Sequence, residues 1–140
     1  MNDFSASLHI SPDLWAQMEV DVEAKAPEEA CGILAGIGNQ SRLVIPITNI
    51  LHSPFRFRME PKEQLDAFLL AENKGLEILA VYHSHPHGIS EPSETDHEEL
   101  TYPGIIYLIW YKVTSEWQCR GFLMSTRNHA DEVSLVISSI

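Results

Sequence analysis

Hydrophobic and polar positions along the chain alternate between two periods, one typical of strands and the other of helices. Short apolar runs rich in Val, Ile and Leu, bounded by turn residues, predict strands. They span residues 5–10, 31–36, 41–50, 76–82, 105–113 and 117–124. The last two flank Thr114-Ser115-Glu116 and therefore predict a hairpin. The tail, residues 132–140, fits a last strand or a terminal helix equally well.

Two stretches have the helical period instead. Ser11-Pro12 predicts a helix start, with Ser as the N-cap and Pro at the first helical position, and this helix should run to about residue 26. Its core-facing residues recur every four positions: Leu14, Met18 and Val22. Glu60-Pro61 predicts a second helix that ends at Asn73-Lys74-Gly75. The residues of this helix expected to face the core are Leu65, Phe68 and Leu69.

The alternation of strands and helices continues without a linker or an internal repeat. It predicts one α/β domain over residues 1–140, an α/β/α sandwich with a mixed sheet. A compact chain of 140 residues buries about two-thirds of its unfolded surface, which suffices for one sheet covered by helices. Residues 51–59 are expected to be extended and irregular.

Composition and charge narrow the class of protein. The chain is 44% hydrophobic and 21% charged, which is ordinary for a globular protein, and no segment has the roughly 20 apolar residues that span a membrane. The N-terminus lacks the pattern of a signal peptide, and Cys31 and Cys119 form no CxxC pair, so the expected location is the cytoplasm. A net charge of −11 with nine Lys and Arg argues against nucleic acid as a partner.

The stretch His83-Ser84-His85-Pro86 has the spacing of a metal site. Residues two apart on a strand project to the same face, so His83 and His85 can bind one ion together, and Pro86 ends the strand there. Asp96 returns ten residues after Pro86, in the first turn of a predicted helix. Two His and one carboxylate leave the fourth tetrahedral position of a zinc ion open for water, as hydrolysis requires.

Ser93 and Asp96 also fit a purely structural role. Ser93-x-x-Asp96 has the spacing of a capping box, with Ser at the N-cap and a carboxylate three residues later. The helix cap and the chemical role do not exclude each other, because a helix N-terminus presents both residues on one face.

An acidic pair upstream supplies a candidate base. Pro27-Glu28-Glu29 leads directly into the small, apolar run 30–36, which reads as a buried strand. A Glu at this junction can reach the water that the metal activates. Glu28 competes with Glu29, since a slip of one residue in a strand turns a side chain to the opposite face.

These residues together resemble the JAMM (MPN-plus) metalloprotease family. The family signature is a Glu early in the domain, then His-Ser/Thr-His-Pro, six residues and Ser-x-x-Asp, and here residues 87–92 supply the six. The resemblance covers about residues 8–124 and implies a cytidine-deaminase-like layer fold. It implies that His83, His85 and Asp96 are the ligands of one zinc ion per chain, that Glu29 is the general base and that Ser93 hydrogen-bonds the developing oxyanion.

The resemblance also implies the reaction and the kind of substrate. Family members cleave a peptide or isopeptide bond after the Gly-Gly tail of ubiquitin-like proteins. Small stand-alone prokaryotic members resemble enzymes that act on ubiquitin-like sulfur-carrier proteins, and the short length of this chain favours that type. Such a tail binds most naturally by adding a strand to a sheet edge, for which residues 55–59 are a candidate.

Two other classes remain as alternatives. A non-catalytic MPN-type domain uses the same fold for protein assembly, but such domains lack the metal residues that this chain carries. Zinc amidohydrolases with His-x-His are built on barrels of about 250 residues, which is longer than this chain. His87, His97 and Cys31 lie close enough in sequence to touch the site, although loop, helix and core positions explain them as well. The oligomeric state is not predicted.

Overall fold

The structure, a computed structural model, describes residues 7–99, 104–126 and 129–138. The strands are β1 (Ser7–Ile10), β2 (Cys31–Ile37), β3 (Gln40–Ile47), β4 (Glu77–His85), β5 (Ile106–Val113), β6 (Glu116–Thr126) and β7 (His129–Ile137). The helices are α1 (Pro12–Lys25), α2 (Pro61–Asn73) and α3 (Glu94–Glu98). None of the helices in the described ranges is long and apolar enough to cross a membrane.

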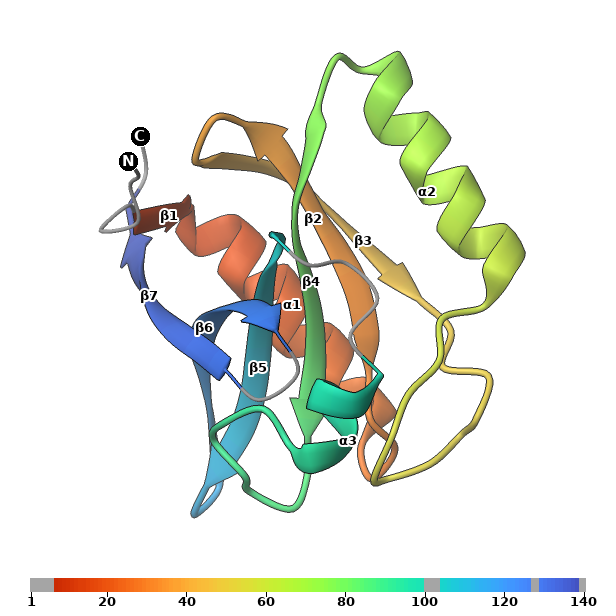
Figure 1. The fold of residues 1–140 in the computed structure, drawn as a ribbon, viewed down its shortest axis with the longest axis vertical. Helices are drawn as coiled ribbons and strands as arrows, with labels where there is room; N and C mark the ends of the chain where they lie inside the picture. The colour runs from red at the N-terminus through yellow and green to blue at the C-terminus, as the bar shows by residue number, and fades with distance from the viewer. Residues whose placement is uncertain (1–6, 100–103, 127–128, 139–140) are drawn as a thin grey trace.

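One mixed sheet contains all of these strands, in the order β1-β3-β2-β4-β5-β6-β7 (Figure 1). The pairs β4–β5, β1–β3 and β1–β7 are parallel, and the other neighbours are antiparallel. Because β1 pairs with both β3 and β7, the sheet closes on itself as a barrel. Strand β4 lies between β2 and β5, and its carboxyl end carries His83 and His85.

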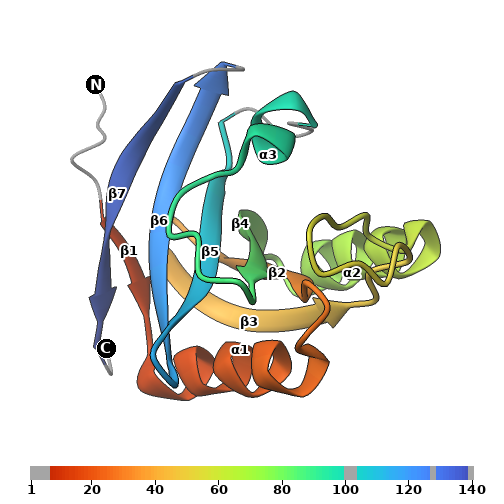
Figure 2. The same ribbon diagram turned by 90° about the horizontal axis from the view of Figure 1, so that it is seen from below.

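Helices lie on both faces of the curved sheet: in Figure 2, α1 lies below β3, and α2 and α3 lie on the opposite side. Residues of α1 pack with one set of strand residues, which includes Ala80 and Tyr82 of β4. Ala67 of α2 packs with the alternate set, which includes Val81. Since side chains alternate along a strand, His83 and His85 lie on the Val81 face, the face that α2 covers.

Polar contacts attach α1 to its face of the sheet. Ser11 caps the helix by accepting a hydrogen bond from the Leu14 amide at 3.2 Å. The Tyr82 hydroxyl donates to Asp21 Oδ2 at 2.7 Å, and the Trp117 indole donates to Glu23 Oε1 at 2.7 Å. These bonds give the polar atoms of two buried aromatic residues a partner, so that their rings can fill the core.

The predicted order of elements is confirmed. Both helices begin at the predicted prolines, residues 51–59 form no helix or long strand, and β5 and β6 form the predicted hairpin. The mixed α/β architecture is also confirmed, and the closure through β1 adds to it. The undecided tail is a strand, β7, because it completes the pairing between β6 and β1.

Two details of the expected pattern were wrong. In α2, Leu65 and Leu69 are 55% and 48% exposed, whereas Ala67 and Ala71 are buried and Phe68 packs partly against the core. The alanines have the same helical spacing as the leucines, so the spacing alone does not tell which face of α2 is buried. The position of the sheet determines that the alanine face is the buried one. The nearly all-apolar run 76–82 also predicts a strand buried on both sides, whereas Glu77 at its start is exposed and complete burial begins at Ala80.

Gly32 pairs with Tyr82 next to the Cys31–His83 pair, and it has no space for a side chain. A Cβ at Gly32 would overlap the ring of Tyr82. We therefore expect Gly32→Ala to lower the free energy of unfolding by about 1–3 kcal/mol, the usual cost of overpacking, measured by urea denaturation. In a Tyr82→Leu background the same change should cost clearly less. Equal costs in both backgrounds would show that the ring is not the obstacle.

Candidate metal centre

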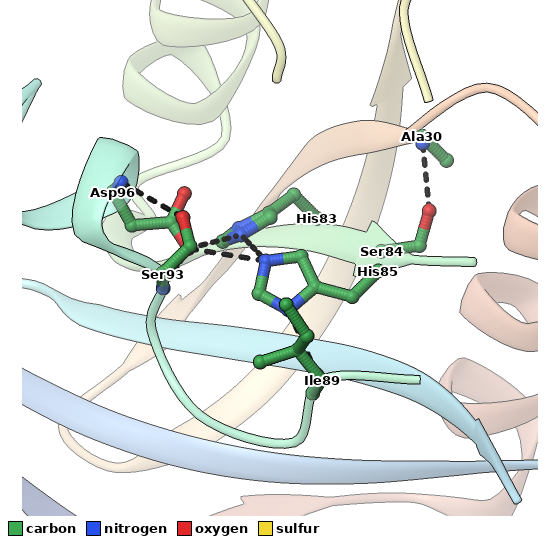
Figure 3. Close-up of polar contacts among 7 residues, drawn as sticks. All are labelled: Ala30, His83, Ser84, His85, Ile89, Ser93 and Asp96. Atoms are coloured by element: carbon green, nitrogen blue, oxygen red, sulfur yellow. Dashed lines mark hydrogen bonds and ion pairs between the residues drawn. The ribbon is translucent and has the colours of Figure 1, made fainter. Parts of the chain in front are cut away.

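Three side chains that are separated in the sequence meet at the carboxyl end of β4. The Nε2 atoms of His83 and His85 lie 3.1 Å apart, and each lies 3.1 Å from Oδ2 of Asp96 (Figure 3). His83 and His85 come from β4, and Asp96 comes from α3. The side chains of all three are at most 8% exposed. The structure therefore brings together the three residues that the sequence predicts as metal ligands.

Each of the three side chains is held from a second direction. Nδ1 of His85 lies 2.8 Å from the Ile89 carbonyl oxygen, and a bond donated there leaves Nε2 with its lone pair. The ring of His83 stacks on Phe57, with 4.6 Å between centroids. Oδ2 of Asp96 accepts a hydrogen bond from the Ser93 amide at 2.8 Å. The donor atoms thus converge on one point.

Glu29 joins this group, and Glu28 does not. A carboxylate oxygen of Glu29 and ring nitrogens of His83 and His85 all lie within 4.8 Å of one another. Glu29 is 3% exposed, and its Oε1 has no hydrogen-bond partner among the described residues. Glu28, with its side chain 38% exposed, contacts Nδ1 of His52 at 3.1 Å. In position, therefore, Glu29 is the acidic residue of the site and Glu28 belongs to the surface.

Burial and neighbouring charges shift the pKa values in the site. Burial raises the pKa of Glu29 from 4.5 to about 7, with smaller and opposing effects from His83 and Asp96. Burial also disfavours the charged form of Asp96, but the neighbouring His83 and His85 hold the pKa of its carboxyl far below the ordinary value. The carboxylate of Asp96 in turn raises the pKa of His83 against the effect of burial. Burial thus brings the pKa of the Glu29 carboxyl close to neutral pH.

The arrangement fits a bound metal ion. Ligands about 2.0–2.1 Å from a tetrahedral zinc lie about 3.3 Å from one another, close to the 3.1 Å separations found here. Glu29 adds a buried carboxylate oxygen that has no hydrogen-bond partner within the described part of the chain. Two imidazoles and a carboxylate are a usual donor set for catalytic zinc. The group of Glu29, His83 and His85 is therefore compatible with a metal ion.

Ser93 forms the predicted helix cap beside this centre. Its hydroxyl accepts a hydrogen bond from the Asp96 amide at 3.0 Å, and its own amide donates to the Asp96 carboxylate. Both halves of the capping box are present. Because the hydroxyl oxygen acts as an acceptor in the cap, its proton is a separate donor that the cap does not use.

A groove of about 430 Å³ begins at Asp96. One wall is formed by residues 57–59, the other by α3 with Glu99, and Val81 and Tyr107 lie between them. An ion pair between Arg56 and Glu99 joins the loop that precedes α2 to the end of α3. Asp96 is the member of the convergent group that lines this groove.

The remaining predicted candidates lie around the centre. His87 stacks on Phe55 at the surface, with ring centroids 5.0 Å apart. His97 is half-buried on α3, next to Asp96. Cys31 points to the same sheet face as Glu29, but it donates to the Ile47 carbonyl and packs in the core. Burial raises the pKa of the Cys31 thiol to about 12, so it stays protonated at neutral pH.

Sequence reasoning missed the residues whose contacts keep Glu29, His83 and His85 in position. The Asn49 side chain donates to the Glu29 carbonyl at 3.0 Å, although the sequence places Asn49 inside a predicted strand. The Ile89 carbonyl contacts His85, and because every residue has a backbone carbonyl, the identity of Ile89 gives no indication of this contact. Phe57 could have been noticed only as an apolar residue in an irregular stretch.

The chain is similar to a known domain family and to known proteins. Residues 11–122 match the family described as prokaryotic homologs of the JAB domain. The chain is 33% identical over 136 residues to a desampylase of Pyrococcus furiosus, with 97% of this chain and 95% of that protein covered. It is 31% identical over 131 residues to a probable TtuB-protein conjugate cleaving protease of Thermus thermophilus, covering 93% and 82% of the two chains.

A solved structure shares the fold. The solution structure of protein DSY2949 from Desulfitobacterium hafniense superimposes with a TM-score of 0.85 at 28% identity, over 95% of this chain and 94% of that one. The match over 11–122 and the named relatives confirm the expectation of a small prokaryotic JAMM-type enzyme. The chain belongs to the JAB (JAMM/MPN) family, in its prokaryotic branch.

Proposed function

We propose that this protein is a zinc-dependent peptidase that cleaves a peptide or isopeptide bond after the C-terminal tail of a ubiquitin-like or sulfur-carrier protein. One observation carries the proposal: the ligand atoms of Glu29, His83 and His85 converge within 4.8 Å, and Asp96 lies 3.1 Å from both histidines at the end of a groove. The relatives named as a desampylase and as a conjugate-cleaving protease support the substrate class.

His83, His85 and Asp96 are the proposed ligands of one zinc ion per chain. Zinc suits two nitrogen ligands and one oxygen ligand, and when bound it polarises a carbonyl and lowers the pKa of water from about 15.7 toward about 7. The bonds from His85 to Ile89 and from Ser93 to Asp96 orient two of the ligands before any ion binds.

Glu29 is the proposed general base and acid. It takes a proton from the attacking water and delivers it to the leaving amine of the cleaved amide. Its raised pKa, about 7, supports this role, because a group that exchanges protons near neutral pH can do both. The Ser93 hydroxyl donates a hydrogen bond to the developing oxyanion, while its oxygen continues to accept the hydrogen bond of the helix cap.

The groove beside Asp96 is the proposed path of the substrate tail. Residues 57–59 form one wall of the groove, and Met59 already forms an isolated antiparallel bridge with Asn49. The segment 55–59 therefore remains our candidate edge for an added strand.

The first prediction concerns the metal. Purified protein should contain about one zinc per chain and cleave a fusion of a ubiquitin-like protein, ending in Gly-Gly, to a reporter. Chelation should abolish the cleavage, and added zinc should restore it. His83→Ala and Asp96→Ala should each lose zinc, measured by metal analysis, while remaining folded. Full zinc occupancy in both variants would refute the ligand assignment.

The second prediction separates metal binding from chemistry. Glu29→Gln should keep its zinc and lose nearly all hydrolysis, because an amide cannot accept the proton of the water. Glu28→Gln is the matched control, one residue away and at the surface, and it should retain activity. If Glu28→Gln were the inactive variant, the assignment of the base would be wrong.

The third prediction concerns Ser93. Ser93→Ala removes the hydroxyl donor and the cap together, whereas Ser93→Asp keeps a good cap and places a negative charge at the oxyanion. Both variants should lose about 100-fold or more in kcat, and Ser93→Asp should keep nearly the thermal stability of the wild type. Near-normal turnover by Ser93→Asp would limit Ser93 to its structural role.

A further inference from the structure

Ser84 lies between the two histidines on β4, and its side chain points to the opposite face of the sheet. It is fully buried, and its hydroxyl accepts a hydrogen bond from the Ala30 amide at 2.7 Å (Figure 3). The Ser84 amide donates to the Ala30 carbonyl at 3.1 Å. Ser84 thus contacts the residue that directly follows Glu29.

This contact extends the sheet by one residue in an unusual way. In the register of β2 and β4, Cys31 pairs with His83, so Ala30 stands opposite Ser84. A regular hydrogen-bonded antiparallel pair exchanges two backbone bonds. Here the hydroxyl of Ser84 takes the place of its own carbonyl as the acceptor. The Ser84 hydroxyl, together with the Ser84 amide, fixes where the chain enters β2.

The backbone of Glu29 makes its own hydrogen bonds with residues outside β4. The Glu29 amide donates to the Ser53 carbonyl at 2.8 Å, and the Glu29 carbonyl accepts from Asn49. Both partners belong to the segment between β3 and α2. The Ser84 contact, in contrast, joins the segment directly to the strand that carries His83 and His85.

We infer that Ser84 is a positioning residue, which holds the Glu29 carboxylate at its working distance from the two ligating histidines. This inference rests on the proposed function. Loss of the hydroxyl leaves the buried Ala30 amide without an acceptor, so residues 29–30 shift or take up water. Displacement of a reacting group by about 1 Å is enough to lower turnover by about 100-fold, whereas the metal ligands on β4 keep their own contacts.

Ser84 variants on the zinc-loaded protein test the role in turnover. With the ubiquitin-like fusion as substrate, Ser84→Ala should lower kcat by at least about tenfold, with KM within about twofold and zinc content unchanged. Ser84→Thr keeps the hydroxyl and should recover most of kcat. Ser84→Cys, close in size with a weak acceptor, should lose kcat in the same direction and covers the case in which Ser84→Ala fails to fold.

Tyr82→Phe is the matched control. It removes another buried hydroxyl from the same face of β4, and the hydrogen bond that it breaks is the one to Asp21 of α1 and not one to Ala30. It should keep kcat within about twofold of the wild type. Wild-type kcat in Ser84→Ala and Ser84→Cys would overturn the inference, as would equal losses in the Ser84 variants and Tyr82→Phe.

Amide hydrogen exchange in the metal-free protein tests the contact without any hydrolysis. The Ala30 amide should exchange at least about tenfold faster in Ser84→Ala than in the wild type, Ser84→Thr or Tyr82→Phe, relative to the Ile33 amide inside β2. Unchanged exchange at Ala30 would overturn the inference. If the wild type cleaved no fusion, the proposed function alone would fail, and the exchange at Ala30 would still decide the contact.

Discussion

The antiparallel pairing of β2 with β4 is the constraint on which the site depends. Its register sets Cys31 opposite His83, so Glu29, at the entrance to β2, lies on the same sheet face as both histidines. A slip of one residue would turn every side chain of one strand to the other face. Gly32 preserves this register because the Tyr82 ring occupies the space where a side chain would lie. Packing on the α1 face thereby fixes the geometry of the face that carries the polar cluster.

The short helix α3 also helps to form the site. This helix has five residues, and its capping box both ends the loop after β4 and aims Asp96 at the histidines. One carboxylate oxygen accepts the Ser93 amide and lies 3.1 Å from both imidazoles. The neighbouring imidazoles keep this buried carboxylate ionised by holding its pKa low. The loop in between is held in turn by Arg120 of β6, which donates to the Ser90 hydroxyl at 3.1 Å.

A buried polar cluster of this kind costs folding energy unless its groups find partners. Oε1 of Glu29 and Nδ1 of His83 lack hydrogen-bond partners among the described residues. The closed sheet and the two apolar clusters on its faces supply the stability that lets such groups stay buried. A bound cation would provide Glu29 with the neighbouring positive charge that the described residues supply only through His83.

The sequence by itself determined the elements, their order and the identity of the convergent residues. His83 and His85 are two apart on a strand, and the capping box marks Ser93 and Asp96, so local periodicity and spacing suffice for them. Between Glu28 and Glu29, the residue pattern left the choice open and the family resemblance pointed to Glu29. The tertiary structure places Glu29 beside the histidines, because that position depends on the register between strands about fifty residues apart. It also decided which face of α2 is buried and whether the tail is a strand. Local sequence encodes periodicity, whereas these choices depend on which long-range partner is present.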